Sequence, residues 1–189
     1  MRLVVLVSGN GTILDAIIGA DIPVSLVVSD RLCPAIERAA AAGLATEVVA
    51  RDTFGAHFDR IAYTKRLTGV LEAASIELVA MAGFGTVLAQ PAYNRYGGRI
   101  LNAHPSLLPA FPGWRAVEDA LAHGVKVTGC TVHQATLAVD SGPILAQEAV
   151  SVLPDDDVAS LHERIKVVER RLYVEVLTRV MADEPVAAW

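Results

Sequence analysis

The chain has 189 residues, of which 53% are hydrophobic and 20% are charged. This balance is typical of a globular protein and excludes an intrinsically disordered chain. The formal net charge is −5, from 16 Lys+Arg against 21 Asp+Glu. An acidic balance argues against nucleic acid as the main partner, because a phosphate backbone requires a basic surface.

Cysteine usage and hydropathy predict a cytoplasmic protein. Cys33 and Cys130 lie far apart and outside any CxxC pattern, which favours a reducing compartment. The first apolar run ends at Ser8-Gly9-Asn10-Gly11, too early for a secretory signal. We find no apolar run long enough to span a membrane and no basic amphipathic stretch, so we expect no membrane contact.

Short apolar runs predict strands, and helically spaced apolar residues predict helices. Leu3–Val7 is wholly apolar, as in a strand buried on both faces. The other expected strands are, in chain order, Val24–Val28, Thr46–Val49, Leu78–Ala82, Arg99–Ala103, Lys126–Gln134 and Ile144–Val152. The expected helices are Ile13–Ala20, Pro34–Ala42, Asp52–Ala74 and a terminal helix that Asp155–Asp157 cap and whose apolar stripe is Leu161, Ile165, Val168, Leu172, Val176 and Val180.

The alternation of strand and helix in the first half predicts right-handed βαβ units. We therefore expect an α/β fold, with a mostly parallel central sheet flanked by helices in a single Rossmann-like domain over residues 1–189. The chain shows no repeat and no low-complexity linker that would divide it.

A glycine loop, Ser8-Gly9-Asn10-Gly11-Thr12, separates the first strand from the first helix. Glycines there let a ligand approach the backbone, and free N–H groups at a helix start favour an anion such as phosphate. A dinucleotide fingerprint would need a third glycine at Leu14, although Asp30 lies near the place of a ribose-binding acid. A tight turn without any ligand remains open.

A proline-rich loop that runs from His104 to Gly113 follows the strand that contains Asn102. Asn102 and His104 are two residues apart, so both side chains leave the same face of an extended segment. An amide donor and an imidazole can stabilise a developing oxyanion and move a proton. Asp140, in the turn Val139–Pro143, could favour the charged form of His104. Ordinary turn and loop roles for these three residues remain the alternative.

The remaining histidines are weaker candidates. His133 could support the site from a neighbouring strand or be a hydrogen-bonded core residue. For His57, His123 and His162 the simplest interpretation is a solvated side chain. No cluster has metal-ligand spacing, so we expect no metal. No GxSxG elbow or Walker A loop suggests a hydrolase or an NTPase.

These motifs resemble those of the phosphoribosylglycinamide formyltransferase family, folate-dependent transferases of purine biosynthesis. Asn102-Ala-His-Pro-Ser-Leu-Leu-Pro-Ala-Phe-Pro-Gly113 is similar to the family signature N-x-HPSLLPxFPG, and Val139-Asp-Ser-Gly-Pro143 follows it. The resemblance covers nearly the whole chain. It implies a phosphate-binding half, residues 1–98 or so, and a folate and catalytic half, residues 99–189 or so.

The resemblance implies that the enzyme transfers the formyl group of 10-formyltetrahydrofolate, its co-substrate, to the amine of glycinamide ribonucleotide (GAR). The amine attacks the formyl carbon, Asn102 and protonated His104 stabilise the oxyanion, and Asp140 keeps His104 charged and oriented. His104, or a water held by Asp140, passes a proton to the leaving folate nitrogen. The implied GAR-binding residues are Gly11, Thr12, Ile13, Lys166 and Glu169. The implied folate-binding residues are Arg60, Gly85, Thr86, Val87, Leu88, Asn102 and Asp140.

The chain departs from the family pattern at three places. Gly85-Thr86 stand where Met-Arg is usual, Thr12-Ile13 replace Ser-Asn, and Trp114-Arg115 stand in a segment that often carries histidines. From the residues alone, the preferred interpretation of Lys166 and Glu169 is a solvated pair on the surface of the last helix.

Several alternatives stay open. They are a formyltransferase for another amine, a formyltetrahydrofolate hydrolase, an NAD(P)-binding oxidoreductase and a binding module without turnover. Formyltetrahydrofolate deformylase and methionyl-tRNA formyltransferase each carry an extra domain, and we expect neither of these appendages in this chain. The expected partners are small molecules, and both a monomer and a homodimer are compatible with the sequence.

Overall fold

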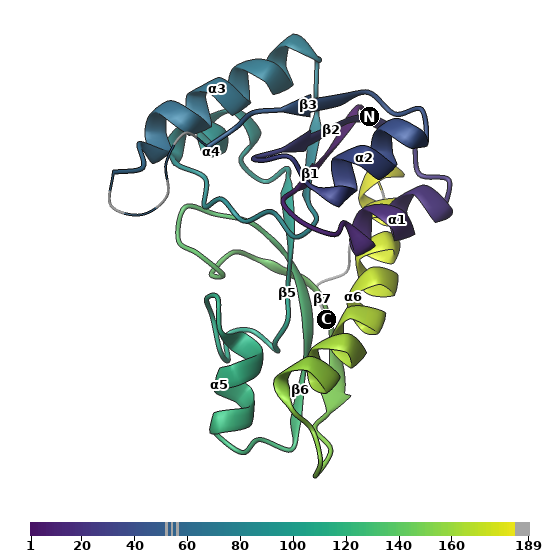
Figure 1. The fold of residues 1–189 in the computed structure, drawn as a ribbon, viewed down its shortest axis with the longest axis vertical. Helices are drawn as coiled ribbons and strands as arrows, with labels where there is room; N and C mark the ends of the chain where they lie inside the picture. The colour runs from purple at the N-terminus through teal and green to yellow at the C-terminus, as the bar shows by residue number, and fades with distance from the viewer. Residues whose placement is uncertain (52, 54, 56, 184–189) are drawn as a thin grey trace. The chain divides into compact units, whose positions relative to one another are not determined.

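The structure is a computed structural model that describes residues 1–51, 53, 55 and 57–183. It divides into two units, Met1–Ile100 and Leu101–Trp189, and the order of their elements along the chain can be followed in Figure 1. In the described residues, no helix is both long and apolar enough to cross a lipid bilayer.

Parallel strands form the centre of the first unit, in the order β3-β2-β1-β4. Every residue of β1 is fully buried, which explains why the sequence there is a continuous apolar run. Helices connect the strands, and α2 packs on β2 and β3. The elements of this unit are β1 (Leu3–Val7), α1 (Thr12–Gly19), β2 (Val24–Ser29), α2 (Pro34–Ala41), β3 (Thr46–Val48), α3 (Arg60–Ala73), β4 (Leu78–Met81) and α4 (Gln90–Tyr96).

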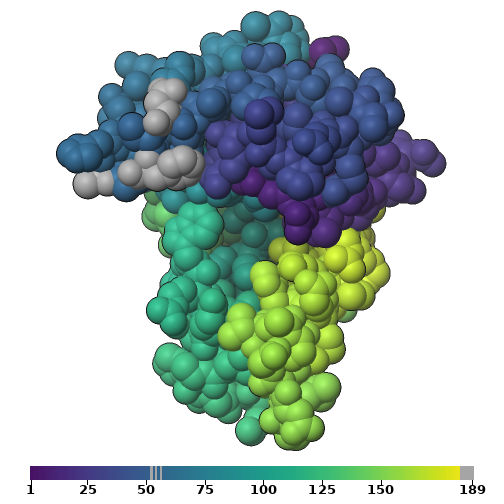
Figure 2. Space-filling model, in the orientation of Figure 1, coloured from purple at the N-terminus to yellow at the C-terminus, as the bar shows by residue number. Residues whose placement is uncertain are grey.

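The second unit is built on antiparallel strands in the order β5-β6-β7. The long helix α6 packs on β6 and β7, and Figure 2 shows its surface in yellow-green. Tyr173 of α6 is fully buried and donates its hydroxyl proton to the Leu101 carbonyl of β5 at 3.0 Å. The elements are β5 (Ile100–His104), α5 (Ala116–Ala122), β6 (Val127–Gln134), β7 (Ile144–Ser151) and α6 (Val158–Met181).

The expected α/β class with a mostly parallel sheet flanked by helices is confirmed. Of the strand pairings described, β1–β2, β1–β4 and β2–β3 are parallel, whereas β5–β6 and β6–β7 are antiparallel. The expected cap of the terminal helix is also confirmed, because Asp157 and Ser160 form a reciprocal capping box.

Some expected helix boundaries and faces were wrong. The helix expected over Asp52–Ala74 begins only at Arg60, where the Asp59 carboxylate accepts the Ala62 N–H at 2.9 Å. Residues 52, 54 and 56 of that expected helix lie outside the described residues. Helices α4 and α5 were not expected, because each has only seven residues. On α6 the expected residues Val168 and Val180 are only half-buried, whereas Tyr173 and Leu177, which were not expected, belong to the buried stripe.

Candidate active site

His104, the last residue of β5, is buried and faces a hydrogen-bond acceptor at each ring nitrogen. Its Nε2 lies 2.8 Å from the Phe111 carbonyl, and its Nδ1 lies 3.4 Å from Oδ2 of Asp140. A neutral imidazole carries only one N–H, so it could donate to only one of these two oxygens. Only a ring that carries a proton on both nitrogens could donate to the Phe111 carbonyl and to the Asp140 carboxylate at the same time.

The carboxylate of Asp140 is fixed from two sides. Its Oδ2 also accepts the Gly113 N–H at 2.8 Å, and its side chain is 7% exposed. The Asp140 backbone has φ +53°, a left-handed conformation that aspartate tolerates better than most residues. A Cβ at Gly142 would lie 1.8 Å from the Gln134 carbonyl, so this turn can approach β6 only with glycine there.

Asn102 is oriented by His133, which stands opposite it in the β5–β6 ladder. The Asn102 amide nitrogen lies 3.3 Å from Nε2 of His133, and Nδ1 of His133 lies 3.1 Å from the Gln134 carbonyl. Only the tautomer with a proton on Nδ1 satisfies both contacts. Burial lowers the pKa of His133, against smaller opposing contributions from Gln134 and Asp140, so the ring is neutral and can accept from Asn102.

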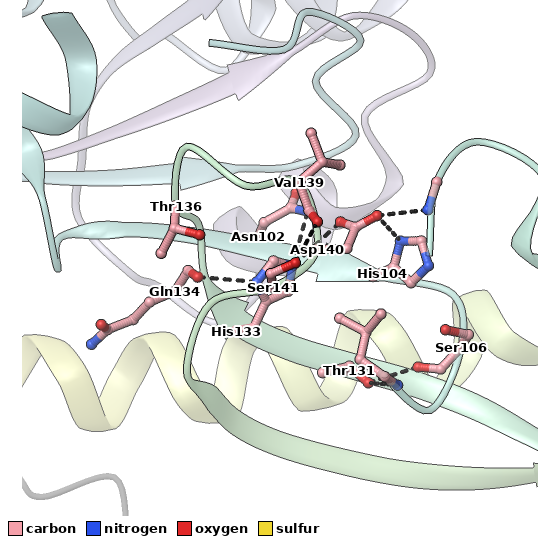
Figure 3. Close-up of polar contacts among 12 residues, drawn as sticks. Asn102, His104, Ser106, Thr131, His133, Gln134, Thr136, Val139, Asp140 and Ser141 are labelled. Atoms are coloured by element: carbon pink, nitrogen blue, oxygen red, sulfur yellow. Dashed lines mark hydrogen bonds and ion pairs between the residues drawn. The ribbon is translucent and has the colours of Figure 1, made fainter. Parts of the chain in front are cut away.

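These four side chains form one polar cluster in the second unit (Figure 3). Besides its contact with Asn102, Nε2 of His133 lies 3.7 Å from Oδ1 of Asp140. Asn102, His104 and Asp140, which the sequence placed 38 residues apart at most, are thus brought together through β5, β6 and the β6–β7 turn.

The loop after His104 is held by polar side chains from β6 and β7. Thr131 donates its hydroxyl proton to the Ser106 carbonyl at 2.7 Å and accepts the Leu108 N–H at 3.0 Å. Gln147 donates to the Leu108 carbonyl at 2.8 Å. Because the backbone of this loop is bonded to the strands, the prolines and these contacts together fix the position of Phe111 and Gly113 relative to His104.

The glycine loop of the first unit leaves N–H groups unused. Gly11 precedes α1 with φ +71°, and a Cβ there would lie 2.5 Å from the Cβ of Ala35. Among the described residues, no hydrogen bond engages the backbone N–H of Thr12 or Ile13. Free donors at a helix start are suited to an anion.

The segment Gly85–Leu88, which follows β4, is tied to the neighbouring strand ends. The Gly85 N–H donates to Oγ of Ser8 at 2.6 Å, and Thr86 donates to the Asp30 carboxylate at 2.7 Å. Arg60 is the first residue of α3 and is exposed, so its guanidinium is accessible to an anionic group.

Glu169 and Lys166 on α6 do not form an ion pair with each other in the described contacts. Lys166 Nζ contacts Oε1 of Glu163 at 2.7 Å. Burial raises the pKa of Glu169 to about 7, although Lys166 and Arg170 oppose the shift. Glu169 is half-buried on α6.

The predicted site residues thus fall into two sets. One set lies in the first unit and comprises Gly11, Thr12, Ile13, Arg60 and Gly85–Leu88; the other lies in the second unit and comprises Asn102, His104, Asp140, Lys166 and Glu169. Sequence reasoning missed the contact of Gly113 with Asp140, since only the fold reveals which loop N–H meets the carboxylate. In the described part of the chain, no group of three or more His, Cys, Asp or Glu side chains could hold a metal.

Comparisons with known proteins point in one direction. A family model described as formyl transferase matches residues 1–177. A phosphoribosylglycinamide formyltransferase of Mycobacterium tuberculosis (strain H37Rv) is 48% identical over 178 residues, which are 92% of this chain and 81% of the relative. One from Bacillus subtilis (strain 168) is 33% identical over 187 residues, 95% of this chain and 94% of the relative. The crystal structure of glycinamide ribonucleotide transformylase 1 from Symbiobacterium toebii has a TM-score of 0.87 at 43% identity and covers 93% of this chain and 85% of that one.

Proposed function

The chain belongs to the formyl transferase family, and from that premise we propose that it transfers the formyl group of 10-formyltetrahydrofolate to the primary amine of GAR in purine biosynthesis. The observation that carries the proposal is the cluster of Asn102, His104 and Asp140, which combines an amide donor, an imidazole and a buried carboxylate. Curated relatives of similar length carry the name of this activity.

In the proposed reaction the GAR amine attacks the formyl carbon and forms a tetrahedral intermediate with an oxyanion. The Nε2–H of His104, which donates to the Phe111 carbonyl in the free protein, turns to this oxyanion. The change of acceptor is favourable because hydrogen bonds to a charged oxygen are stronger than those to a neutral carbonyl. Asp140 stabilises the imidazolium throughout.

Asn102 supplies the second donor to the oxyanion. One of its two amide protons is directed to His133, which leaves the other for the substrate. The intermediate then expels the folate nitrogen, which takes its proton from His104 or through a water held by Asp140. The attacking nitrogen, which becomes an ammonium in the intermediate, returns a proton to the same His104 or water, so that one proton moves in net from the amine to the folate nitrogen. Removing one such donor typically lowers the rate ~10²–10³-fold.

In this proposal the remaining predicted residues bind the two substrates. The GAR phosphate accepts from the N–H groups of Gly11, Thr12 and Ile13, and Lys166 and Glu169 contact its ribonucleotide part. The folate pterin bonds to the backbone of Gly85–Leu88 and to Asn102 and Asp140, and Arg60 binds its anionic tail. Residues 1–189 act in this proposal as one formyltransferase domain, with a phosphate-binding half (about 1–98) and a folate and catalytic half (about 99–189).

The proposal needs no metal or further cofactor and takes the protein to be cytoplasmic, with these small molecules as its partners. The position of Asp30 argues against an NAD(P)-binding oxidoreductase, in which this carboxylate would have to be free to bind a ribose hydroxyl. Its side chain is fully buried, and its oxygens accept from Arg31 and Thr86 within the protein. Light scattering at working concentration distinguishes a monomer from a homodimer.

The test is a spectrophotometric assay with a 10-formylfolate substrate and GAR. We expect loss of the formyl group from the folate only when GAR is present, with formyl-GAR as the product. Equal loss without GAR would identify a hydrolase, and no loss with tight folate binding would identify a binding module. An N102A variant, expected to be ~10²–10³-fold slower, controls for a contaminating activity.

A further inference from the structure

The connection between β4 and α4 is held in place by side chains rather than by regular secondary structure. The Gly85 N–H donates to Ser8, which follows β1, and the Thr86 hydroxyl donates to Asp30, which follows β2. Further along, the Ala89 N–H donates to the Thr64 hydroxyl of α3 at 3.0 Å. Because β2, β1 and β4 are neighbours in the sheet, their carboxyl ends bring these partners together.

Asp30 is the centre of this arrangement. It is 1% exposed, and the Arg31 guanidinium donates a hydrogen bond to each of its carboxylate oxygens, at 2.9 Å and 3.0 Å. Burial alone would raise the pKa of Asp30, but hydrogen bonds from Arg31, Thr86 and Ser8 outweigh it and lower the pKa. The group is therefore a carboxylate, and its bond to the Thr86 hydroxyl, itself 1% exposed, is charge-assisted.

Gly85 is part of the same arrangement. A Cβ at this position would lie 3.4 Å from Oγ of Ser8 and 3.5 Å from Nη2 of Arg31. These are ordinary van der Waals distances, so Gly85 lies directly against the Ser8 and Arg31 side chains. Gly85 therefore packs beside the Arg31 side chain that holds Asp30, and Thr86 contacts the same carboxylate.

This anchoring leaves the middle of the segment open to a ligand. In the described part of the chain, no hydrogen bond engages the backbone groups of Val87. An edge of free N–H and C=O groups on a fixed segment can recognise a flat heterocycle with donors and acceptors along one side, without first losing conformational entropy.

We propose that Asp30 and Thr86 are positioning residues for folate, since their hydrogen bond fixes the Gly85–Leu88 backbone in the shape that receives the pterin. Neither needs to contact the reacting atoms. The inference deepens the proposed function and rests on it.

The test compares T86V, which removes the hydroxyl at constant shape, with T86S, which keeps it. T178V is the matched control, because Thr178 donates its hydroxyl to a carbonyl on the exposed side of α6. The readouts are kcat, the two KM values and the Kd of 5,8-dideazafolate as the probe. Thermal melting verifies that each variant is folded.

We expect T86V to raise the folate KM and the probe Kd roughly fivefold to tenfold, while kcat and the GAR KM change less than twofold. T86S and T178V should resemble the parent. An unchanged folate KM in T86V, or an equal effect on kcat and both KM values, overturns the positioning role and leaves the proposed function standing. A parent protein that neither binds the probe nor transfers formyl overturns both.

Discussion

Nδ1 of His104 lies 3.4 Å from Oδ2 of Asp140, and the same carboxylate oxygen accepts the Gly113 N–H. On its other side the imidazole donates to Phe111, two residues before Gly113 in the chain. The proline-rich loop therefore bonds to the imidazole and to its carboxylate partner at once. A shift of this loop would therefore change the contacts of the His104 imidazole and of the Asp140 carboxylate together.

Replacing the carboxylate should disable the site with little change of shape. We expect D140N to lower kcat about 10²–10³-fold, because the imidazolium of His104 loses its counter-charge at the moment the oxyanion needs it. Steady-state kinetics at saturating substrates measure the effect. D155N removes an exposed carboxylate elsewhere and should be neutral. Activity of D140N within a few-fold of the parent would exclude Asp140 from catalysis.

His133 should act on the reaction by orienting Asn102. We expect H133A to lower kcat roughly tenfold with KM values little changed, because the Asn102 amide loses the acceptor that orients it. H133Q offers an amide oxygen in place of Nε2 and should recover part of the rate. If H133Q is no better than H133A while both remain folded by circular dichroism, orientation of Asn102 is not the reason.

Glu169 should destabilise the free protein as pH rises. Its pKa is about 7 in the fold against 4.5 for an unperturbed glutamate, so the folded state holds a proton that the unfolded state has lost between these values. Stability attributable to this group is present below pH 4.5 and declines up to about pH 7. E169Q should therefore be more stable than the parent at pH 8, by about 1–2 kcal/mol after solvent screening.

The stability gain of E169Q should vanish at pH 4.5. The same substitution should raise the KM for GAR, since a carboxylate proposed to bind GAR is lost. Urea titrations at both pH values, together with kinetics at pH 8, test the two parts. Equal stability of parent and variant at both pH values would show that the carboxyl is not desolvated.

Gly11 should be required by both the fold and the phosphate loop. G11A places a Cβ 2.5 Å from Ala35 at φ +71°, which should cost roughly 1–3 kcal/mol and raise the GAR KM. A Cβ at Gly9 meets nothing within 4 Å, so G9A is the control for stability. Thermal melts that shift equally for G11A and G9A would contradict the steric argument.

Local pattern predicted the central strands well. Leu3–Val7 was found at its expected bounds, since an apolar run between a charged residue and a glycine turn has few other solutions. Local pattern failed where long-range contacts decide. The Asn102–His133 contact depends on the β5–β6 register, and the Thr86–Asp30 bond depends on strand order, neither of which periodicity reveals. The start of α3 was missed because Asp59 was not recognised as its cap.

The most direct measurement is the rate of formyl loss from 10-formylfolate, with and without GAR, for the parent and for N102A. The account predicts GAR-dependent loss in the parent, with formyl-GAR formed in equal amount, and almost none in N102A. Loss that is independent of GAR, or that survives the removal of Asn102, would contradict it.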